Sequence, residues 1–129
     1  HQMATTTFKN DMIVTGTLNA QGGLKATVGT ATATAGAATL AAKVGKVTTE
    51  ALTTAQNVIY TLTITNTAIA AADVVTASVA NGTNTQGTPM IGTVTPGAGT
   101  LVITVINKHA TAQALNGTLV VSFRAVTAA

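Results

Sequence analysis

Threonine alternates with apolar residues over several stretches of this chain, most clearly in residues 58–65. In that stretch Tyr60, Leu62 and Ile64 fall on one face of an extended backbone, and three threonines fall on the other. A period of two residues is the pattern of a β-strand that buries one face and exposes the other. The chain is therefore expected to fold mainly as β-sheet.

The same alternation recurs through the second part of the chain. Asn-Gly and Pro-Gly pairs, which favour tight turns, separate several of the alternating stretches. Residues 101–106 are apolar on both faces, which predicts a central strand or one covered on its second side. We expect an all-β fold, an antiparallel, jelly-roll-like β-sandwich of about six to eight strands. The expected strands are residues 47–49, 58–65, 74–79, 90–95, 101–106 and 118–126.

The composition changes near residue 45 and divides the chain into two parts. Residues 1–3 are read as a probable cloning remnant with a start methionine. Residues 4–45 are rich in Ala, Gly and Thr and have few large side chains. Because such a stretch has little to bury, it is predicted to be an extended N-terminal arm that contacts a partner. Residues 46–129 are predicted to be the sandwich domain.

Three segments of the predicted arm have local patterns of their own. Residues 13–18 are expected to form one short strand. Residues 30–35 alternate threonine with alanine, which is typical of an extended segment. For residues 37–43, one or two helical turns are the alternative. Alone the arm would fold poorly, so we expect it to order on a partner or among other copies of the chain.

Charge is scarce, since Asp, Glu, Lys and Arg make up 7% of the chain and the formal net charge is +3. Catalysis usually needs a cluster of ionisable groups, so a structural or binding role is favoured over an enzyme. Nucleic-acid binding usually needs a dense basic patch with stacking aromatics, and the chain has one Tyr, two Phe and no Trp. No run approaches the ~18 apolar residues of a membrane span. We expect neither nucleic acid nor a membrane as partner.

The residues with reactive side chains are few and dispersed. There is no cysteine, which excludes a disulfide or a thiolate site. His109 falls in an expected loop, and the three carboxylates Asp11, Glu50 and Asp73 fall on three separate segments. A metal site or a glycosidase pair needs several such groups to converge. We therefore expect no catalytic residue, no metal and no cofactor.

Four of the six basic residues precede residue 47, namely Lys9, Lys25, Lys43 and Lys46. A mildly basic segment favours contact with an acidic surface. The alternative is that these lysines are solvated on a loop-rich arm. They are the residues that the sequence singles out as contacts.

Several stretches have a common character, namely residues 47–50 through 60–63, 81–85, 94–99 and 114–119. These stretches resemble small virion proteins of tailed bacteriophages, of the capsid decoration (cement) and head-fibre kind. The resemblance covers residues 45–126, and it rests on the overall character of the sequence and not on a catalytic signature. Residues 13–18 and 21–23 are also similar to segments of phage fibres.

Proteins of this kind are commonly trimeric β-structures that bind where capsid subunits meet and reinforce the shell. The resemblance implies a non-enzymatic protein of the virion, made in the host cytoplasm and located on the capsid surface. Its implied partners are itself, as a homotrimer, and the major capsid protein. Lys9, Lys25, Lys43 and Lys46 then become the expected capsid or subunit contacts. The alternative is a phage-fibre or adhesin module that binds host surface carbohydrate.

Overall fold

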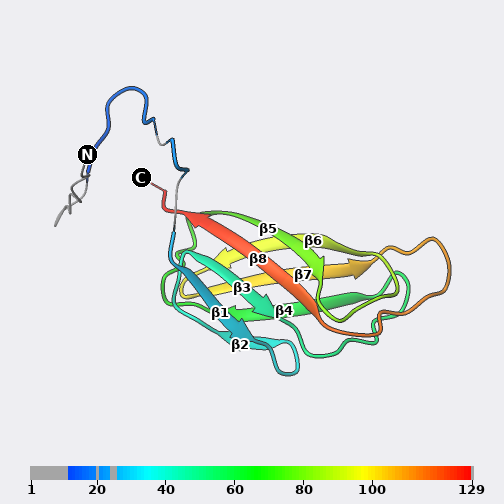
Figure 1. Ribbon diagram of the computed structural model, residues 1–129. Coiled ribbons are helices and arrows are strands. Elements are labelled where there is room, and N and C mark those ends of the chain that lie inside the picture. The colour runs from blue at the N-terminus through cyan, green and yellow to red at the C-terminus, as the bar shows by residue number, and fades with distance from the viewer. Residues whose placement is uncertain (1–11, 20, 24–25, 129) are drawn as a thin grey trace.

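The chain folds as a β-sandwich of two four-stranded sheets, seen in a computed structural model that describes residues 12–19, 21–23 and 26–128 (Figure 1). The described residues form eight strands and no helix. The strands are β1 (Val28–Thr32), β2 (Ala37–Thr39), β3 (Val44–Thr48), β4 (Ile59–Thr65), β5 (Val74–Asn81), β6 (Pro89–Gly97), β7 (Thr100–Asn107) and β8 (Leu119–Val126). Sheet A has the order β1-β3-β8-β5, and sheet B has the order β2-β4-β7-β6. The expected all-β sandwich is confirmed.

Successive strands alternate between the two sheets, except for the β6–β7 hairpin within sheet B. The edge pairs β1–β3 and β2–β4 are parallel, whereas the other pairs are antiparallel. Both sheets are therefore mixed, which corrects the expected purely antiparallel sandwich. The reason is that the chain reverses direction at Ala35 and Gly36 and again between β2 and β3 while it alternates between the sheets, so that β3 runs parallel to β1 and β4 parallel to β2. This strand order does not confirm the jelly-roll form of the prediction.

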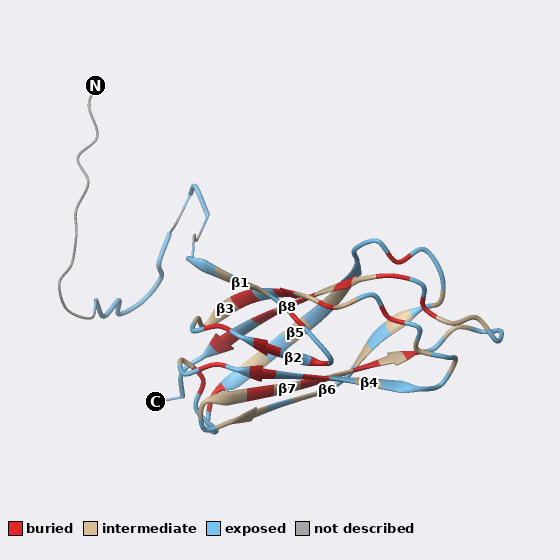
Figure 2. Ribbon diagram, turned by 90° about the horizontal axis from the view of Figure 1, so that it is seen from below, coloured by how far each residue is buried: buried red, intermediate tan, exposed pale blue. Residues whose placement is uncertain are grey.

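The core lies between the sheets and is built from the inward side of the alternating pattern (Figure 2). Leu62 and Ile64 of β4 and Ile103 and Val105 of β7 are all 0% exposed. Full burial of such a side chain contributes about 1.5–3 kcal/mol to the free energy of folding. β7 lies between β4 and β6, which confirms the central strand predicted from its two apolar faces.

The sandwich begins earlier than the sequence predicted. β1 and β2 lie within the residues assigned to the arm, so the sandwich starts at Val28 and not at residue 46. Ala33 and Ala38 are buried, and both belong to the core. These small side chains reach the core, so a low-complexity stretch buries more than its composition suggested. Residues 37–39 form a strand, and the helical alternative for residues 37–43 is wrong.

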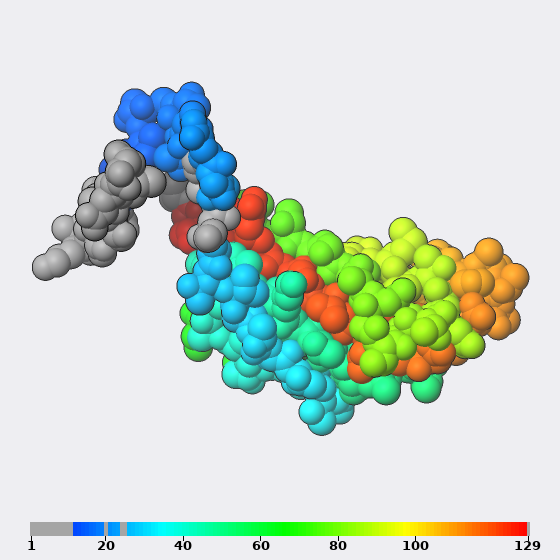
Figure 3. All heavy atoms as spheres, in the orientation of Figure 1, coloured from blue at the N-terminus to red at the C-terminus, as the bar shows by residue number. Residues whose placement is uncertain are grey.

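Ahead of the sandwich, residues 12–19 form neither helix nor strand, and the short strand expected at residues 13–18 is wrong. Gly16 interrupts this segment with a φ of 101°, which an extended strand does not adopt. In Figure 3 the described part of the segment projects from the end of the sandwich at which β1 begins and β8 ends. The arm predicted for the residues before Val28 stays a prediction.

Candidate functional site

The outward residues of sheet B form a surface that we call the threonine face. Their outward direction follows from the alternating burial along β4 and β7, in which every second residue is buried in the core. None of the outward residues on these four described strands is charged. The threonine face consists of Ala37, Thr39, Ile59, Thr61, Thr63, Thr65, Met90, Thr93, Thr95, Thr100, Val102, Thr104 and Ile106.

The threonine face has an apolar end and a hydroxyl-rich centre. Ile59, Ile106 and Met90 lie opposite one another across three neighbouring strands, and they form one apolar row. One row further on, β6 bulges, and the Thr104 Oγ1 atom accepts a hydrogen bond of 2.7 Å from the Thr93 backbone N–H. The Thr93 and Thr104 hydroxyl oxygens are also 2.9 Å apart, at hydrogen-bond distance. The backbone N–H of the bulge thus finds its hydrogen-bond acceptor in a side chain that carries no charge.

The outward residues of sheet A form a second surface, which we call the basic face. It carries two cations, Lys46 of β3 and Arg124 of β8, among serines, threonines and valines. No outward residue of these described strands is acidic. The basic face consists of Val28, Thr30, Thr32, Val44, Lys46, Thr48, Val74, Thr76, Ser78, Ala80, Val120, Ser122, Arg124 and Val126.

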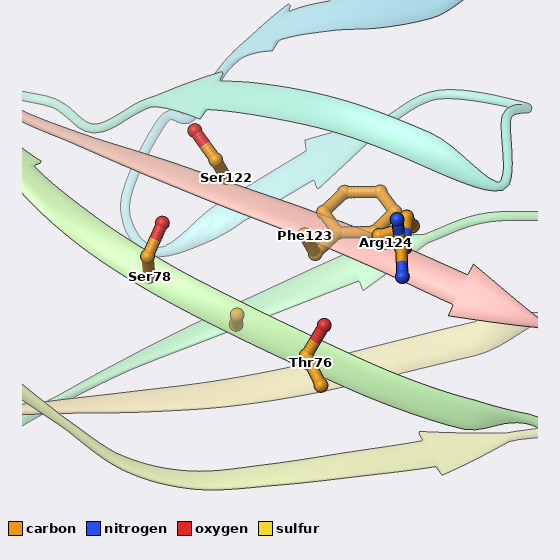
Figure 4. A pocket seen from close by; sticks show the side chains of 6 residues that line it. Thr76, Ser78, Ser122, Phe123 and Arg124 are labelled. Carbon is orange, nitrogen blue, oxygen red and sulfur yellow. The ribbon is translucent and has the colours of Figure 1, made fainter. Parts of the chain in front are cut away.

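An open hollow of about 380 Å³ lies between β5 and β8 on sheet A. Figure 4 shows the side chains of Thr76, Ser78, Ser122 and Arg124 around it. Thr76 lies directly opposite Arg124 in the sheet register, and Ser78 lies directly opposite Ser122. The hollow therefore combines one guanidinium with three hydroxyls, a set of hydrogen-bond donors suited to an anionic oxygen group.

Asp73, at the start of β5, forms an ion pair with Lys43, whose Nζ atom lies 2.5 Å from its Oδ2 atom. The same carboxylate accepts a 3.0 Å hydrogen bond from the Ala70 backbone N–H. The hydrogen bond from Lys43, followed by that from Ala70, holds the pKa of Asp73 below its usual value. This arrangement closes the loop before β5 and occupies Lys43, one of the predicted contact residues.

Glu50 lies between β3 and β4, and its carboxylate has a structural role. Its two carboxylate oxygens accept hydrogen bonds from the Gly36 backbone N–H, at 2.8 Å, and from the Tyr60 hydroxyl, at 2.9 Å. Burial, and after it the hydrogen bond to Glu50, raises the pKa of Tyr60 well above its ordinary value. Glu50 therefore fixes the β1–β2 turn against β4, and it lies apart from the other described carboxylate, Asp73, which has its own partner.

At the end of the sandwich where β7 ends, a buried asparagine connects the loops. The Asn107 amide donates hydrogen bonds to the Thr54 and Gln113 carbonyls, at 3.0 and 2.7 Å, and accepts one from the Thr88 N–H at 3.0 Å. His109 lies in the same loop region, where its Nδ1 atom accepts a 3.2 Å hydrogen bond from the backbone of Thr111. Nowhere in the described residues do three His, Asp or Glu side chains gather as metal ligands would.

The predicted contact residues have three different outcomes. Lys9 and Lys25 lie outside the described residues. Lys43 forms an ion pair with Asp73, and Lys46 is exposed on the basic face. The sequence did not single out Arg124, although the alternation of β8 placed it on the side opposite the buried residues. Its neighbours on β3 and β5 depend on strand pairing, which alternation alone does not reveal.

No protein-family model, no curated protein and no solved structure matches the chain. Among the residues that the structure describes, there is no helix with the length and apolar character needed to cross a membrane. The chemistry available for a functional argument is therefore that of the surfaces: a threonine face without charge, a basic face with an open hollow, and an apolar segment ahead of β1.

Proposed function

We propose that the chain is a non-enzymatic structural protein of a tailed-bacteriophage virion, which decorates and stabilises the capsid. The observation that carries this proposal is the segment ahead of β1. Met12, Ile13 and Leu18 lie on it, and each is more than half exposed, with Ile13 at 88%. Large hydrophobic side chains gathered on an exposed segment mark an interaction site. A shell of repeated subunits offers such a segment many equivalent binding positions, and avidity then makes weak individual contacts sufficient.

Two further features support the same function. The stretches that resemble phage decoration and head-fibre proteins supply most of the strands of the sandwich, from β3 to β8. The scarcity of charge also suits a protein held permanently by neighbours, because few charged groups lose water when the contact forms. Both features favour attachment to an assembly over turnover of a substrate.

Contacts between copies, in the proposed homotrimer, are assigned to the threonine face. Two copies that meet through this face oppose hydroxyl and methyl groups without opposing like charges. Contact through the basic faces would instead bring Lys46 and Arg124 of one copy toward the same cations of another. Like charges brought together at an interface cost several kcal/mol. The neutral face is therefore the one that tolerates another copy of this chain.

The proposed function is tested by cosedimentation of the purified chain with capsids of the phage that encodes it. The test variant replaces Met12, Ile13 and Leu18 with serine, and the control replaces exposed Val58 with serine. We expect the chain and the control to sediment with capsids, and the triple variant to bind at least about tenfold more weakly, since three large side chains lose their burial. Equal binding by the triple variant would refute the attachment segment. Absence of the chain from purified virions would refute the function.

The carbohydrate-binding alternative receives less support from the described aromatic residues. Sugar sites commonly use an exposed aromatic ring, but Tyr60 is half-buried and bonded to Glu50, and Phe123 is buried in the core. Saturable binding to a glycan array, together with absence of the chain from the phage head, would favour that alternative.

A further inference from the structure

Arg124 belongs to a group of polar side chains on the basic face. It is directly opposite Thr76 of β5, and in the adjacent row Ser122 is opposite both Ser78 of β5 and Lys46 of β3. Opposite residues of a sheet have Cβ atoms about 5 Å apart, and successive rows on one face are about 7 Å apart. These five side chains, which we call the arginine patch, therefore occupy an area about 10 Å across.

The arginine patch is not neutralised within the described chain. The two described carboxylates already have partners, because Asp73 binds Lys43 and Glu50 binds both Gly36 and Tyr60. Among the described residues, none of the five side chains of the patch makes a side-chain hydrogen bond or an ion pair. Within the part of the chain that the structure describes, two cations and three hydroxyls are thus left as donors without a partner, and four of these side chains line the hollow of about 380 Å³.

We propose that the arginine patch is a binding site for carboxylate side chains on an acidic protein surface. The Arg124 guanidinium donates two parallel hydrogen bonds to a carboxylate, a geometry that arginine forms readily. The hydroxyls of Thr76 and Ser122 donate to the remaining lone pairs, and Lys46 binds a second acidic group one row away. The basic face of a second copy does not fit, because it is itself cationic.

The position of the patch points to the shell as its occupant. Arg124 lies in the same row of sheet A as Val28, with Val44 between them, and β1 begins at Val28. The segment proposed to attach the chain therefore leaves the sandwich beside the patch. An acidic sugar is a poorer fit, because the aromatic ring at the hollow, that of Phe123, is 3% exposed and offers no surface for stacking. This inference rests on the proposed function only in naming the capsid as the source of the carboxylates.

The site is tested first without capsids, by NMR titration of the full-length ¹⁵N-labelled chain with the blocked peptide acetyl-Glu-Gly-Glu-amide. We expect saturable shifts of the backbone amides around Thr76, Ser78, Ser122 and Arg124, and no such shifts with acetyl-Gln-Gly-Gln-amide. Raising the salt from 50 to 300 mM should weaken binding about threefold, because the patch is solvent-exposed. No saturable shifts with the glutamate peptide, or equal shifts with both peptides, would overturn the proposal. Stronger binding of N-acetylneuraminic acid at these amides would assign the site to an acidic sugar instead.

Three variants test whether peptide binding depends on the arginine patch or only on the net positive charge of the chain. Arg124→Gln should weaken peptide binding about fivefold and Lys46→Gln about twofold, the range expected for exposed ion pairs. Lys108→Gln, which removes the same charge at the opposite end of the sandwich, should leave binding unchanged. Equal weakening by Lys108→Gln would overturn the proposal. Thermal unfolding of each variant checks that the fold is kept, as expected for exposed positions.

The same variants in the capsid assay separate this inference from the proposed function. If the wild-type chain binds capsids and Arg124→Gln binds them equally well, decoration stands and the shell is the wrong source of the carboxylates. If the chain does not bind capsids but the glutamate peptide binds at the patch, the site stands and decoration fails. Loss of both binding activities in Arg124→Gln, with Lys108→Gln unaffected, supports the two together.

Discussion

The two outer faces of this sandwich are built from the same alternation of threonine and apolar residues, yet they differ in charge. The threonine face of sheet B has no charged side chain, whereas the basic face of sheet A carries Lys46 and Arg124. Both faces cover one shared core. Two cations within a repeated pattern are therefore enough to distinguish the faces, and on this difference we base the proposal that the neutral face meets another copy and the cationic face an acidic surface.

The largest expected effect comes from a substitution in the core, because the core supports both faces. Ile103 is fully buried on β7, and its neighbour Val102 points outward on the threonine face. Ile103→Ala should lower the free energy of unfolding by about 2–5 kcal/mol, since it removes buried methyl groups and leaves a cavity. Val102→Ala should cost less than about 1 kcal/mol, because the side chain is only half-buried. Urea unfolding measures both. Similar losses for the two variants would contradict the assignment of inward and outward residues.

A charge placed on one face should affect self-association, and the same charge on the other face should not. Thr63 on β4 and Thr30 on β1 are both exposed strand threonines, on sheets B and A respectively. Thr63→Lys should weaken self-association at least about tenfold, because like charges would meet between copies. Thr30→Lys should leave it unchanged. Sedimentation equilibrium measures the mass of each. A monomeric wild-type chain, or equal effects of the two lysines, would contradict the role given to the threonine face.

The smallest expected effect concerns acid pH at the edge of sheet A. The pKa of Asp73 is lower in the folded chain than in the unfolded chain, where it is about 3.9. The pair with Lys43 therefore stabilises the fold above that pH, and this contribution is lost as the pH falls through the folded pKa. Protonation also releases Lys43 as a third cation beside the basic face.

Thermal unfolding between pH 7 and pH 2 checks this expectation. The melting temperature of the wild-type chain should fall more steeply below pH 4 than that of Asp73→Asn, which has no carboxylate to protonate. Asp73→Asn should already be less stable at pH 7. Parallel pH profiles of the two proteins would show that the ion pair contributes nothing to the acid sensitivity.

Most strands were predictable because a period of two residues directly reports a half-buried strand. β4, β5 and β8 follow that pattern, β7 was predicted from its two apolar faces, and the structure confirms all four. The Pro96-Gly97 pair predicted a turn slightly too early, since β6 continues through Gly97 and the turn lies at residues 98–99. Proline is tolerated there because β6 is an edge strand, where one side of the backbone needs no partner.

The alternation at residues 30–35 predicted an extended segment, which β1 confirms in part, but β2 and the arginine patch were not predictable, for a different physical reason. Ala33 and Ala38 are buried because β1 and β2 lie on the two sheets that enclose the core, and composition does not encode that placement. Likewise, Arg124 and Lys46 become neighbours only because β8 pairs with both β3 and β5. Alternation assigns a residue to a face, but pairing decides which residues on that face lie together.

The most direct test of decoration is an electron cryomicroscopy map of the native virion. Density for the sandwich should lie on the capsid, with the basic face turned toward acidic residues of the shell and the threonine face toward another copy. Absence of this density from the capsid, or density in which the basic face points to solvent and the threonine face to the shell, would contradict the account.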